Sequence, residues 1–268
     1  MHVWDSLFRF AREFNDGHIF WSKESGFQAT TGSIDQWLRE HNVMFATSDQ
    51  EYPQASPSGG NGIRQVFRGG AVYSSSLGTF LVRDDSCYDD EGVSEGWLGF
   101  PIGEEARNGD LGYKQHFEAG TVCTHTHYEE YPARTESFAV QAEIVRIMAP
   151  DRAFRPTSRV ETVRWGELYL ITQRLEIEEE SGAAETAVYW DGANKPIVVA
   201  PQIWDYYSEL GGQTSWLGFP VDSSKTSPRG SGQQDFEQGA IYWLPDIGPH
   251  AVPNAVRGLI RQDHAAGG

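Results

Sequence analysis

The hexapeptide SWLGFP at 215–220 recurs almost unchanged as GWLGFP at 96–101. A second pair of related blocks follows these copies, HFEAGTVCT at 116–124 after the earlier one and DFEQGAIYW at 235–243 after the later one. Self-similarity at a fixed spacing of about 20–50 residues is the sequence signature of repeat architectures. The two motifs are therefore parts of one unit that occurs more than once in the chain.

Blocks related to the second motif occur five times along the chain. In chain order they are EFNDGHIFW at 13–21, VFRGGAVYS at 66–74, HFEAGTVCT at 116–124, AAETAVYW at 183–190 and DFEQGAIYW at 235–243. The fourth block keeps only the end of the pattern, and the other four carry a glycine before the aromatic strand.

The last residues of these blocks lie 53, 50, 66 and 53 positions apart. We interpret the long spacing as an insertion at 165–183, a hairpin with an acidic tip. The sequence therefore predicts one domain over 1–268, with approximate repeat units at 9–62, 63–112, 113–162, 163–231 and 232–264.

Each unit reads as short strands, a turn and a short helix. Residues 240–243 alternate toward a terminal aromatic as strands do, and Ile34, Trp37 and Leu38 have helical apolar spacing. A unit this small cannot bury its own apolar face, so it must stack on its neighbours or close into a ring. We therefore predict a mainly β fold with short helices, arranged as a closed, propeller-like ring of five repeats in which the two termini meet.

Composition narrows the classes of partner. The chain has 21 Lys and Arg against 38 Asp and Glu, a net charge of −17. A field of that sign repels phosphate backbones and anionic lipid, so we expect no nucleic-acid and no membrane partner. The first residues lack the basic-then-apolar pattern of a signal peptide, which leaves either a cytoplasmic chain or a segment of a longer protein. Cys87 and Cys123 form either one bridge or two buried thiols.

These motifs resemble the LGFP repeat family, which occurs in tandem on actinobacterial cell-envelope proteins. The resemblance is strongest at 96–120 and 216–258, where apolar, glycine, proline and polar positions agree. It implies a ring of hairpins and short helices that binds carbohydrate or anchors an attached enzyme to the wall. It also implies an envelope or extracellular location if the chain is part of a secreted protein; otherwise we expect a cytoplasmic one.

Aromatic residues at the strand ends are the first candidates for a ligand site. Sugar rings present apolar C–H faces that pack on an exposed aromatic ring, while nearby amides and carboxylates bind the hydroxyls. Successive strand residues point to opposite faces, so one ring of each Tyr-Trp pair belongs to the core. The candidates are Trp21, Tyr73, Trp190 and Trp243.

Polar residues beside two strand phenylalanines form the second set of candidates, Gln115, Glu118, Gln234 and Glu237. They either bind glycan hydroxyls between adjacent units or tie the backbone of one unit to the next. The second interpretation is favoured because most side-chain hydrogen bonds go to backbone or water.

Signatures of catalysis and metal binding are weak. No G-x-S-x-G, no H-E-x-x-H and no phosphate-binding glycine loop is present. Cys123, His125 and His127 share one face of a strand, but no further ligand cluster completes a zinc site. Acidic residues after the Leu-Gly-Phe-Pro positions are Asp49, Glu51, Glu104, Glu105 and Asp222. We expect no catalytic residue, no metal and no cofactor, with glycoside hydrolysis by such acids a minor possibility.

The sequence thus predicts a non-catalytic module that recognises glycan, above all an actinobacterial wall polysaccharide, through aromatic-lined grooves between repeats. Several weak equivalent sites would raise avidity on a polymer. The alternative is an intracellular ligand-sensing or protein-interaction domain at the end of a larger multidomain protein, with a fused or partner protein domain in place of the glycan.

Overall fold

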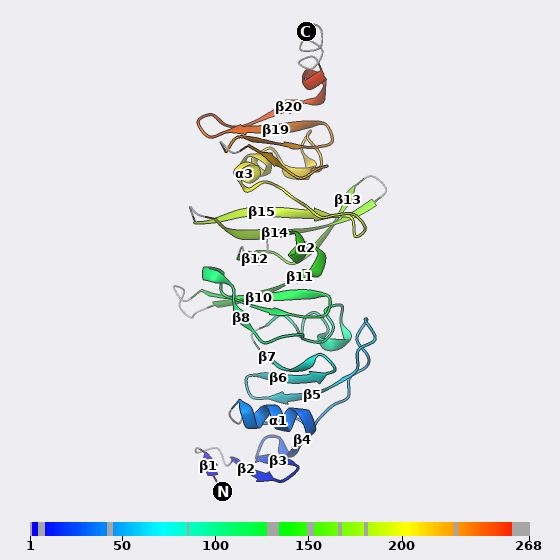
Figure 1. Ribbon diagram of the computed structural model, residues 1–268, viewed down its shortest axis with the longest axis vertical. Helices are drawn as coiled ribbons and strands as arrows, with labels where there is room; N and C mark the ends of the chain where they lie inside the picture. Colours follow the sequence, from blue (N-terminus) through cyan, green and yellow to red (C-terminus); the bar gives the residue numbers. More distant parts are fainter. Residues whose placement is uncertain are drawn as a thin grey trace. The chain divides into compact units, whose positions relative to one another are not determined.

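The computed structural model describes residues 2–4, 9–41, 45–84, 86–127, 134–148, 153–165, 168–179, 182–227 and 230–258 (Figure 1). These residues form mainly β-strands with a few short helices, as the sequence predicts. The chain divides into two compact units, Met1–Val145 and Arg146–Gly268, and each unit is described by itself.

The described part of the first unit contains three antiparallel sheets. Their strands are β1 (His2–Trp4), β2 (Arg9–Phe14), β3 (Gly17–Ser22) and β4 (Gly26–Thr31); β5 (Gly62–Phe67), β6 (Gly70–Ser75) and β7 (Gly78–Arg83); and β8 (Ala106–Arg107), β9 (Tyr113–His116), β10 (Gly120–His127) and β11 (Arg134–Gln141). The helical elements are α1 (Gly32–Glu40), the 3₁₀ turns η1 (Val93–Glu95) and η2 (Gly109–Leu111), and α2 (Ala142–Ile147), which continues into the second unit.

The described part of the second unit contains two antiparallel sheets. Their strands are β12 (Phe154–Pro156), β13 (Glu161–Trp165), β14 (Leu168–Glu179), β15 (Gly182–Trp190) and β16 (Ile197–Val198); and β17 (Lys225–Thr226), β18 (Gly232–Asp235), β19 (Gly239–Leu244) and β20 (Gly248–Pro253). Helix α3 (Pro201–Glu209) and the 3₁₀ turn η3 (Gly212–Thr214) join the two sheets.

Each of the five aromatic blocks supplies the central strand of one sheet, namely β3, β6, β10, β15 and β19. Within a unit the sheets and helices alternate as layers. Helix α1 contacts both the β3–β4 edge of its own sheet and strands β6 and β7 of the next, and α3 contacts β15 on one side and β19 and β20 on the other (Figure 1). This layering gives each small sheet the apolar cover that it cannot provide for itself.

The described strands form five open sheets and no closed barrel or propeller. The predicted mainly β fold with short helices is therefore confirmed. The closed, propeller-like ring of five repeats stays a prediction.

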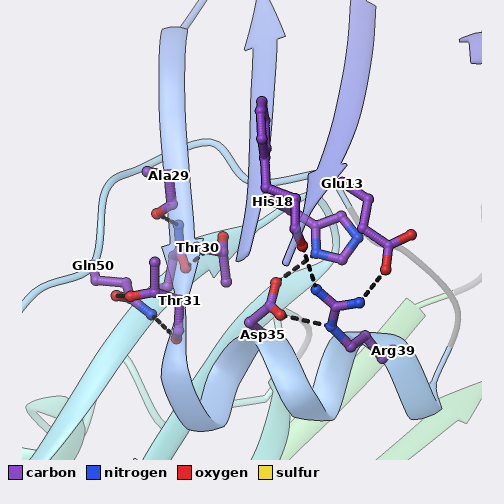
Figure 2. Close-up of polar contacts among 10 residues, drawn as sticks. Glu13, His18, Ala29, Thr30, Thr31, Asp35, Arg39 and Gln50 are labelled. Carbon is purple, nitrogen blue, oxygen red and sulfur yellow. Dashed lines mark hydrogen bonds and ion pairs between the residues drawn. The ribbon is translucent and has the colours of Figure 1, made fainter. Parts of the chain in front are cut away.

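A buried polar network fixes α1 on the first sheet (Figure 2). Nδ1 of His18 on β3 lies 2.5 Å from Oδ1 of Asp35 on α1, and Arg39 Nε donates to Asp35 Oδ2 at 2.8 Å. Arg39 also forms an ion pair with Glu13 of β2. Because His18 and Asp35 are both buried, each polar group needs the partner that the other supplies. The network anchors one side of α1 to the first sheet. Ile34 of the same helix packs in a core cluster to which side chains of β5 and β6 also contribute.

The predicted insertion is shorter than the segment 165–183. On β14, Gln173 pairs with Val188, which lies fifteen residues later, whereas Gln115 pairs with Val122, seven residues later. The eight extra residues lengthen the β14–β15 hairpin by four pairs, from Glu176 opposite Glu185 to Glu179 opposite Gly182. The first part of β14 therefore corresponds to the first strand of the other repeats. Only the end of the β14–β15 hairpin next to its turn is inserted relative to them. The tip that the sequence predicts to be acidic includes 180–181, which lie outside the described residues.

The Leu-Gly-Phe-Pro motif is an edge segment of the core. Leu98 and Phe100 are fully buried, and the motif runs antiparallel to the strand end that carries Phe117, with Ala119 N donating to Leu98 O at 3.0 Å. Gly99 has a φ of +71°, a left-handed conformation that favours glycine. The copy at 217–220 repeats these contacts residue for residue, with Leu217 and Phe219 buried and Gly218 at a φ of +74°.

Candidate functional site

The predicted glutamines are buried clamps between repeats. Gln115 Nε2 donates to Leu81 O of β7 at 2.9 Å and to Gly103 O at 3.0 Å. Gln234 Nε2 donates to Val198 O of β16 at 3.0 Å and to Asp222 O at 3.2 Å. Each amide thus joins the third strand of the preceding repeat to the residues that follow Leu-Gly-Phe-Pro. These contacts fit the structural interpretation of the pair and leave their amide donors no exposed face for a glycan.

Two further glutamines belong to the same set. Gln65 Nε2 donates to Ala29 O at 3.0 Å and to Ser48 O at 2.9 Å, and Gln173 Nε2 donates to Ser158 O at 3.0 Å. The sequence signal for Gln173 is its place two residues before Leu175, where three other repeats have Gln-x-Phe. It was hidden because Leu replaces Phe and because the segment reads as part of the insertion.

The predicted glutamates hold the motif rather than an open groove. Glu118 Oε2 accepts the Phe100 N–H at 2.7 Å, and Glu237 Oε2 accepts the Phe219 N–H at 3.0 Å. Desolvation opposes ionisation of Glu118, but hydrogen bonds from Ser58, the Phe100 N–H and Ser56 outweigh it and lower the pKa of Glu118. The carboxylate therefore completes the backbone hydrogen bonding of Leu-Gly-Phe-Pro, and the glycine of the motif lets it approach.

Two of the four predicted aromatics are core residues. Tyr73 is buried in the cluster that also contains Phe100 and Phe117. Trp243 is buried in the cluster of the last two sheets, and its Nε1 donates to Gly230 O at 3.1 Å. Both side chains are almost fully buried, although the edge of Trp243 contributes to the lining of an open groove of about 470 Å³ beside β17 and β18.

Trp21 is half-buried and belongs to an aromatic row that crosses the first sheet. It stacks on Phe10 of β2 with ring centroids 5.5 Å apart and contacts Phe27 of β4 at 6.4 Å. The three residues are register partners on adjacent strands, and Phe27 is exposed. The row is an aromatic surface that Phe27 exposes to solvent.

Trp190 lines a pocket of about 460 Å³ in the second unit. The pocket is formed by the turn between β15 and β16 and by the residues that follow the motif at 217–220. Its lining residues are Leu170, Tyr189, Trp190, Asp191, Asn194, Lys195, Pro196, Ile197, Pro220, Val221, Asp222 and Ser223. Of the four predicted aromatics, Trp190 is the one that stands in this pocket, and it does so beside two carboxylates, an amide, an ammonium group and a hydroxyl.

Hydrogen bonds within the turn fix the polar wall of this pocket. Asp191 Oδ1 accepts the Ala193 N–H at 3.0 Å and the Asn194 N–H at 2.7 Å, and Oδ2 accepts Asn194 Nδ2 at 2.6 Å. These bonds, led by the backbone N–H of Asn194, lower the pKa of Asp191, which is therefore ionised at neutral pH. Trp190 Nε1 donates to Asn194 O at 2.6 Å, so the same turn fixes the indole ring. The geometry provides one oriented aromatic ring and a preformed row of hydrogen-bonding groups.

A second groove of about 300 Å³ lies in the first unit and shares two lining positions with the Trp190 pocket. Thr79 and Pro196 hold the same register position in the outer strands of their sheets, and Glu104 and Ser223 each stand three residues after the proline of the motif. The groove is lined by Ser33, Gln36, Trp37, Glu40, His41, Thr79 and Glu104. In the sequence Trp37 reads only as a helix residue, since nothing local shows that Glu104, 67 positions later, lies against α1.

The aromatic wall of the second groove is a stacked pair. The imidazole of His41 lies on the indole of Trp37 with centroids 4.3 Å apart and an interplanar angle of 9°. Trp37 Nε1 donates to Glu104 Oε1 at 3.4 Å, which ties the loop after the first motif to α1. His41 is the exposed member of the pair and Trp37 the buried one.

The loop acids have structural partners. Asp49 accepts the Ala29 N–H at 3.3 Å, and Glu51, Glu105 and Asp222 lie 3.7, 3.1 and 3.5 Å from the cationic groups of Arg64, Arg83 and Lys225 respectively. With Glu104 on Trp37, these five residues are spread over both units. Asp222 alone also lines the Trp190 pocket.

The two cysteines are buried thiols that form no disulfide with each other. Burial raises the pKa of Cys87 to about 11 and that of Cys123 to about 12. Across the described residues, no group of three His, Cys, Asp or Glu side chains is arranged to hold a metal ion. Cys123 is buried, and the side chain of His127 lies outside the described ones.

Among the helices that the structure describes, none combines the length and the apolar character needed to cross a bilayer.

Comparison with known families gives one match. Residues 217–267 match the model of the LGFP repeat family. The matched segment begins at Leu217 of the second motif and includes β17–β20. No match to a curated protein is found. The chain therefore contains an LGFP repeat at 217–267. This repeat includes residues 220–223 of the Trp190 pocket and the strands of the last sheet.

Proposed function

We propose that this chain is a non-catalytic repeat module that binds glycan, with the Trp190 pocket as its principal site. The observation that carries the proposal is the pocket itself, where one fixed indole stands beside Asp191, Asn194, Lys195 and Asp222. An aromatic ring covers the C–H face of a sugar, and the polar groups around it accept and donate hydrogen bonds to the hydroxyls.

The size and charge of the pocket favour a neutral sugar unit. A volume of about 460 Å³ lies in the range of roughly 300–1,000 Å³ typical of small-molecule sites. Asp191 and Asp222 outnumber Lys195 in the lining, and the chain carries a net charge of −17. Both features oppose a polyanion, because its charge would meet a field of the same sign.

The second groove, at Trp37 and His41, supports a polymeric ligand. Two sites on one chain raise the overall affinity for a polysaccharide when both can engage it, even if each binds only weakly. The LGFP repeat at 217–267 supports a repeat module of this kind, and the resemblance of the wider chain to that family suggests actinobacterial wall polysaccharide as the ligand. A protein-interaction domain without glycan affinity is the alternative that the following experiment separates from it.

The test is binding of the purified chain to delipidated, peptide-free polysaccharide from an actinobacterial wall, measured by pull-down and calorimetry. Trp190→Ala should weaken binding at least tenfold, because the pocket loses its aromatic wall. Trp216→Ala is the matched control, since Trp216 also presents part of its indole to solvent but lies outside both grooves. Wild-type chain that fails to bind the polysaccharide contradicts the proposal, and so does a Trp190→Ala variant that folds and binds with unchanged affinity.

A further inference from the structure

Consecutive repeats share one kind of apolar interface. An isoleucine in the first turn of a helix is covered by a phenylalanine at the end of the next first strand. Ile34 of α1 is 0 % exposed in a cluster with Phe67 of β5, which is 2 % exposed. Ile203 of α3 is 0 % exposed in a cluster with Phe236, which is also 2 % exposed.

In the described part of the last repeat, the residue at the isoleucine position of this interface is exposed. Val256 stands five residues after Ala251, as Ile34 stands five residues after Ala29, and Ala251 and Ala29 hold the same register position in β20 and β4. Val256 is 44 % exposed, although the corresponding Ile34 is 0 % exposed. We call Val252, Val256 and the backbone oxygen of Ala251 the tail face.

In the described part of the first repeat, the residue at the phenylalanine position is exposed as well. Phe14 stands three residues before Gly17 at the start of the central strand, as Phe236 does before Gly239. Phe14 is 45 % exposed, whereas Phe236 is 2 % exposed. Phe14 is therefore the exposed counterpart of a residue that internal interfaces bury.

Arg12 adds a polar contact to this side. It pairs with Ile19 on the central strand, as Gln234 pairs with Ile241, and so holds the position of a clamp glutamine. Its guanidinium lies over the Phe14 ring at 5.4 Å. Because Gln234 donates to Val198 O and Ala251 holds the register position of Val198, Arg12 has the matching acceptor in Ala251 O of a tail face. We call Arg12 and Phe14 the head face.

We propose that two copies of this chain associate head to tail, with the head face of one copy on the tail face of the other. The two faces are the two halves of an interface that the chain forms internally, which is the reason for choosing a second copy as the occupant. Such contact is heterologous, so association continues beyond the dimer. The internal Ile203–Phe236 interface also contains Leu217 and Phe219 of Leu-Gly-Phe-Pro, which the head face does not include. The association is therefore weak, with a dissociation constant on the order of 100 µM.

Sedimentation of the purified chain from about 10 µM to about 1 mM tests the proposal, at an ionic strength of about 0.15 M that screens the repulsion between chains of like charge. The mean mass should rise above that of the monomer with concentration. Phe14→Asp blocks the head face and Val256→Asp blocks the tail face, so each variant alone should stay monomeric. An equimolar mixture should form dimers and nothing larger, because one intact head and one intact tail remain.

Leu244→Asp is the matched control, since Leu244 is as exposed as Phe14 but belongs to neither face, and this variant should associate like the wild type. All three substitutions are at exposed side chains, and thermal unfolding verifies that the variants fold. A wild type that stays monomeric up to 1 mM overturns the proposal, including the case in which head and tail close within one chain. Single variants that associate like the wild type, or a mixture that stays monomeric, overturn it as well. The outcome does not depend on glycan binding.

Discussion

Replacing Gln234 by alanine should loosen the last two sheets from each other. The side chain makes three hydrogen bonds to the backbone of the preceding repeat and of the motif loop. Its Nε2 donates to Val198 O at 3.0 Å and to Asp222 O at 3.2 Å, and its Oε1 accepts the Ala200 N–H at 2.8 Å. All are lost in Gln234→Ala, and each is worth about 1 kcal/mol net. We therefore expect a loss of about 3 kcal/mol, which lowers the melting temperature of a unit of this size by roughly 12 °C.

Urea and thermal unfolding measure this loss, and hydrogen exchange locates it. The Ala200 amide, which donates to Gln234 in the wild type, should exchange much faster in the variant. Gln233→Ala is the matched control on the same strand, because Gln233 is half-buried and bonds only to Asp235, at 3.2 Å, in the described contacts. It should cost less than about 0.5 kcal/mol. A Gln234→Ala variant no less stable than this control refutes the clamp.

Gly218→Ala should destabilise the chain by about 2 kcal/mol in thermal unfolding, because φ is +74° and the new Cβ would lie 2.3 Å from Glu237 Oε2; an unchanged melting temperature contradicts the role given to this glycine. Glu118 has a pKa lowered below its ordinary value of 4.5, so its stabilising contribution is present above that pH and is lost as the pH falls through the folded-state pKa. The wild type should therefore lose stability in urea more steeply than Glu118→Gln below about pH 5, and parallel curves would contradict this. Cys87 and Cys123, with pKa values of about 11 and 12, should react with a thiol reagent at pH 8 only after unfolding; rapid labelling of the folded chain would show that the thiols are accessible.

The repeat and its strands follow from local sequence because strand alternation and the glycine before each aromatic block are local patterns. Which of Trp190 and Trp243 is buried does not follow from local sequence. Both tryptophans stand at the same register position of a central strand, but Trp243 lies opposite Gly232, whose missing Cβ lets the indole lie flat on the sheet. Trp190 lies opposite Ile171, whose side chain leaves no such space, and its ring faces the pocket. Burial is thus decided by a cross-strand partner that only the register reveals.

The rest of the Trp190 pocket also depends on tertiary structure. Asp222 follows Trp190 by 32 positions and reads in the sequence as one of many loop acids. It reaches the pocket because the motif at 217–220 lies beside the last sheet and returns the chain toward the β15–β16 turn. Asp191, Asn194 and Lys195 are adjacent to Trp190, so a search of the turn after each aromatic strand could have found them.

The most direct test of glycan binding in the Trp190 pocket is an NMR titration of the labelled chain with oligosaccharides from an actinobacterial wall. The indole N–H of Trp190 and the amides of 191–195 and 222–223 should shift together along one saturable curve. Saturation of the chain with those resonances unmoved, or shifts confined to surfaces far from the β15–β16 turn, would contradict the assignment of the site.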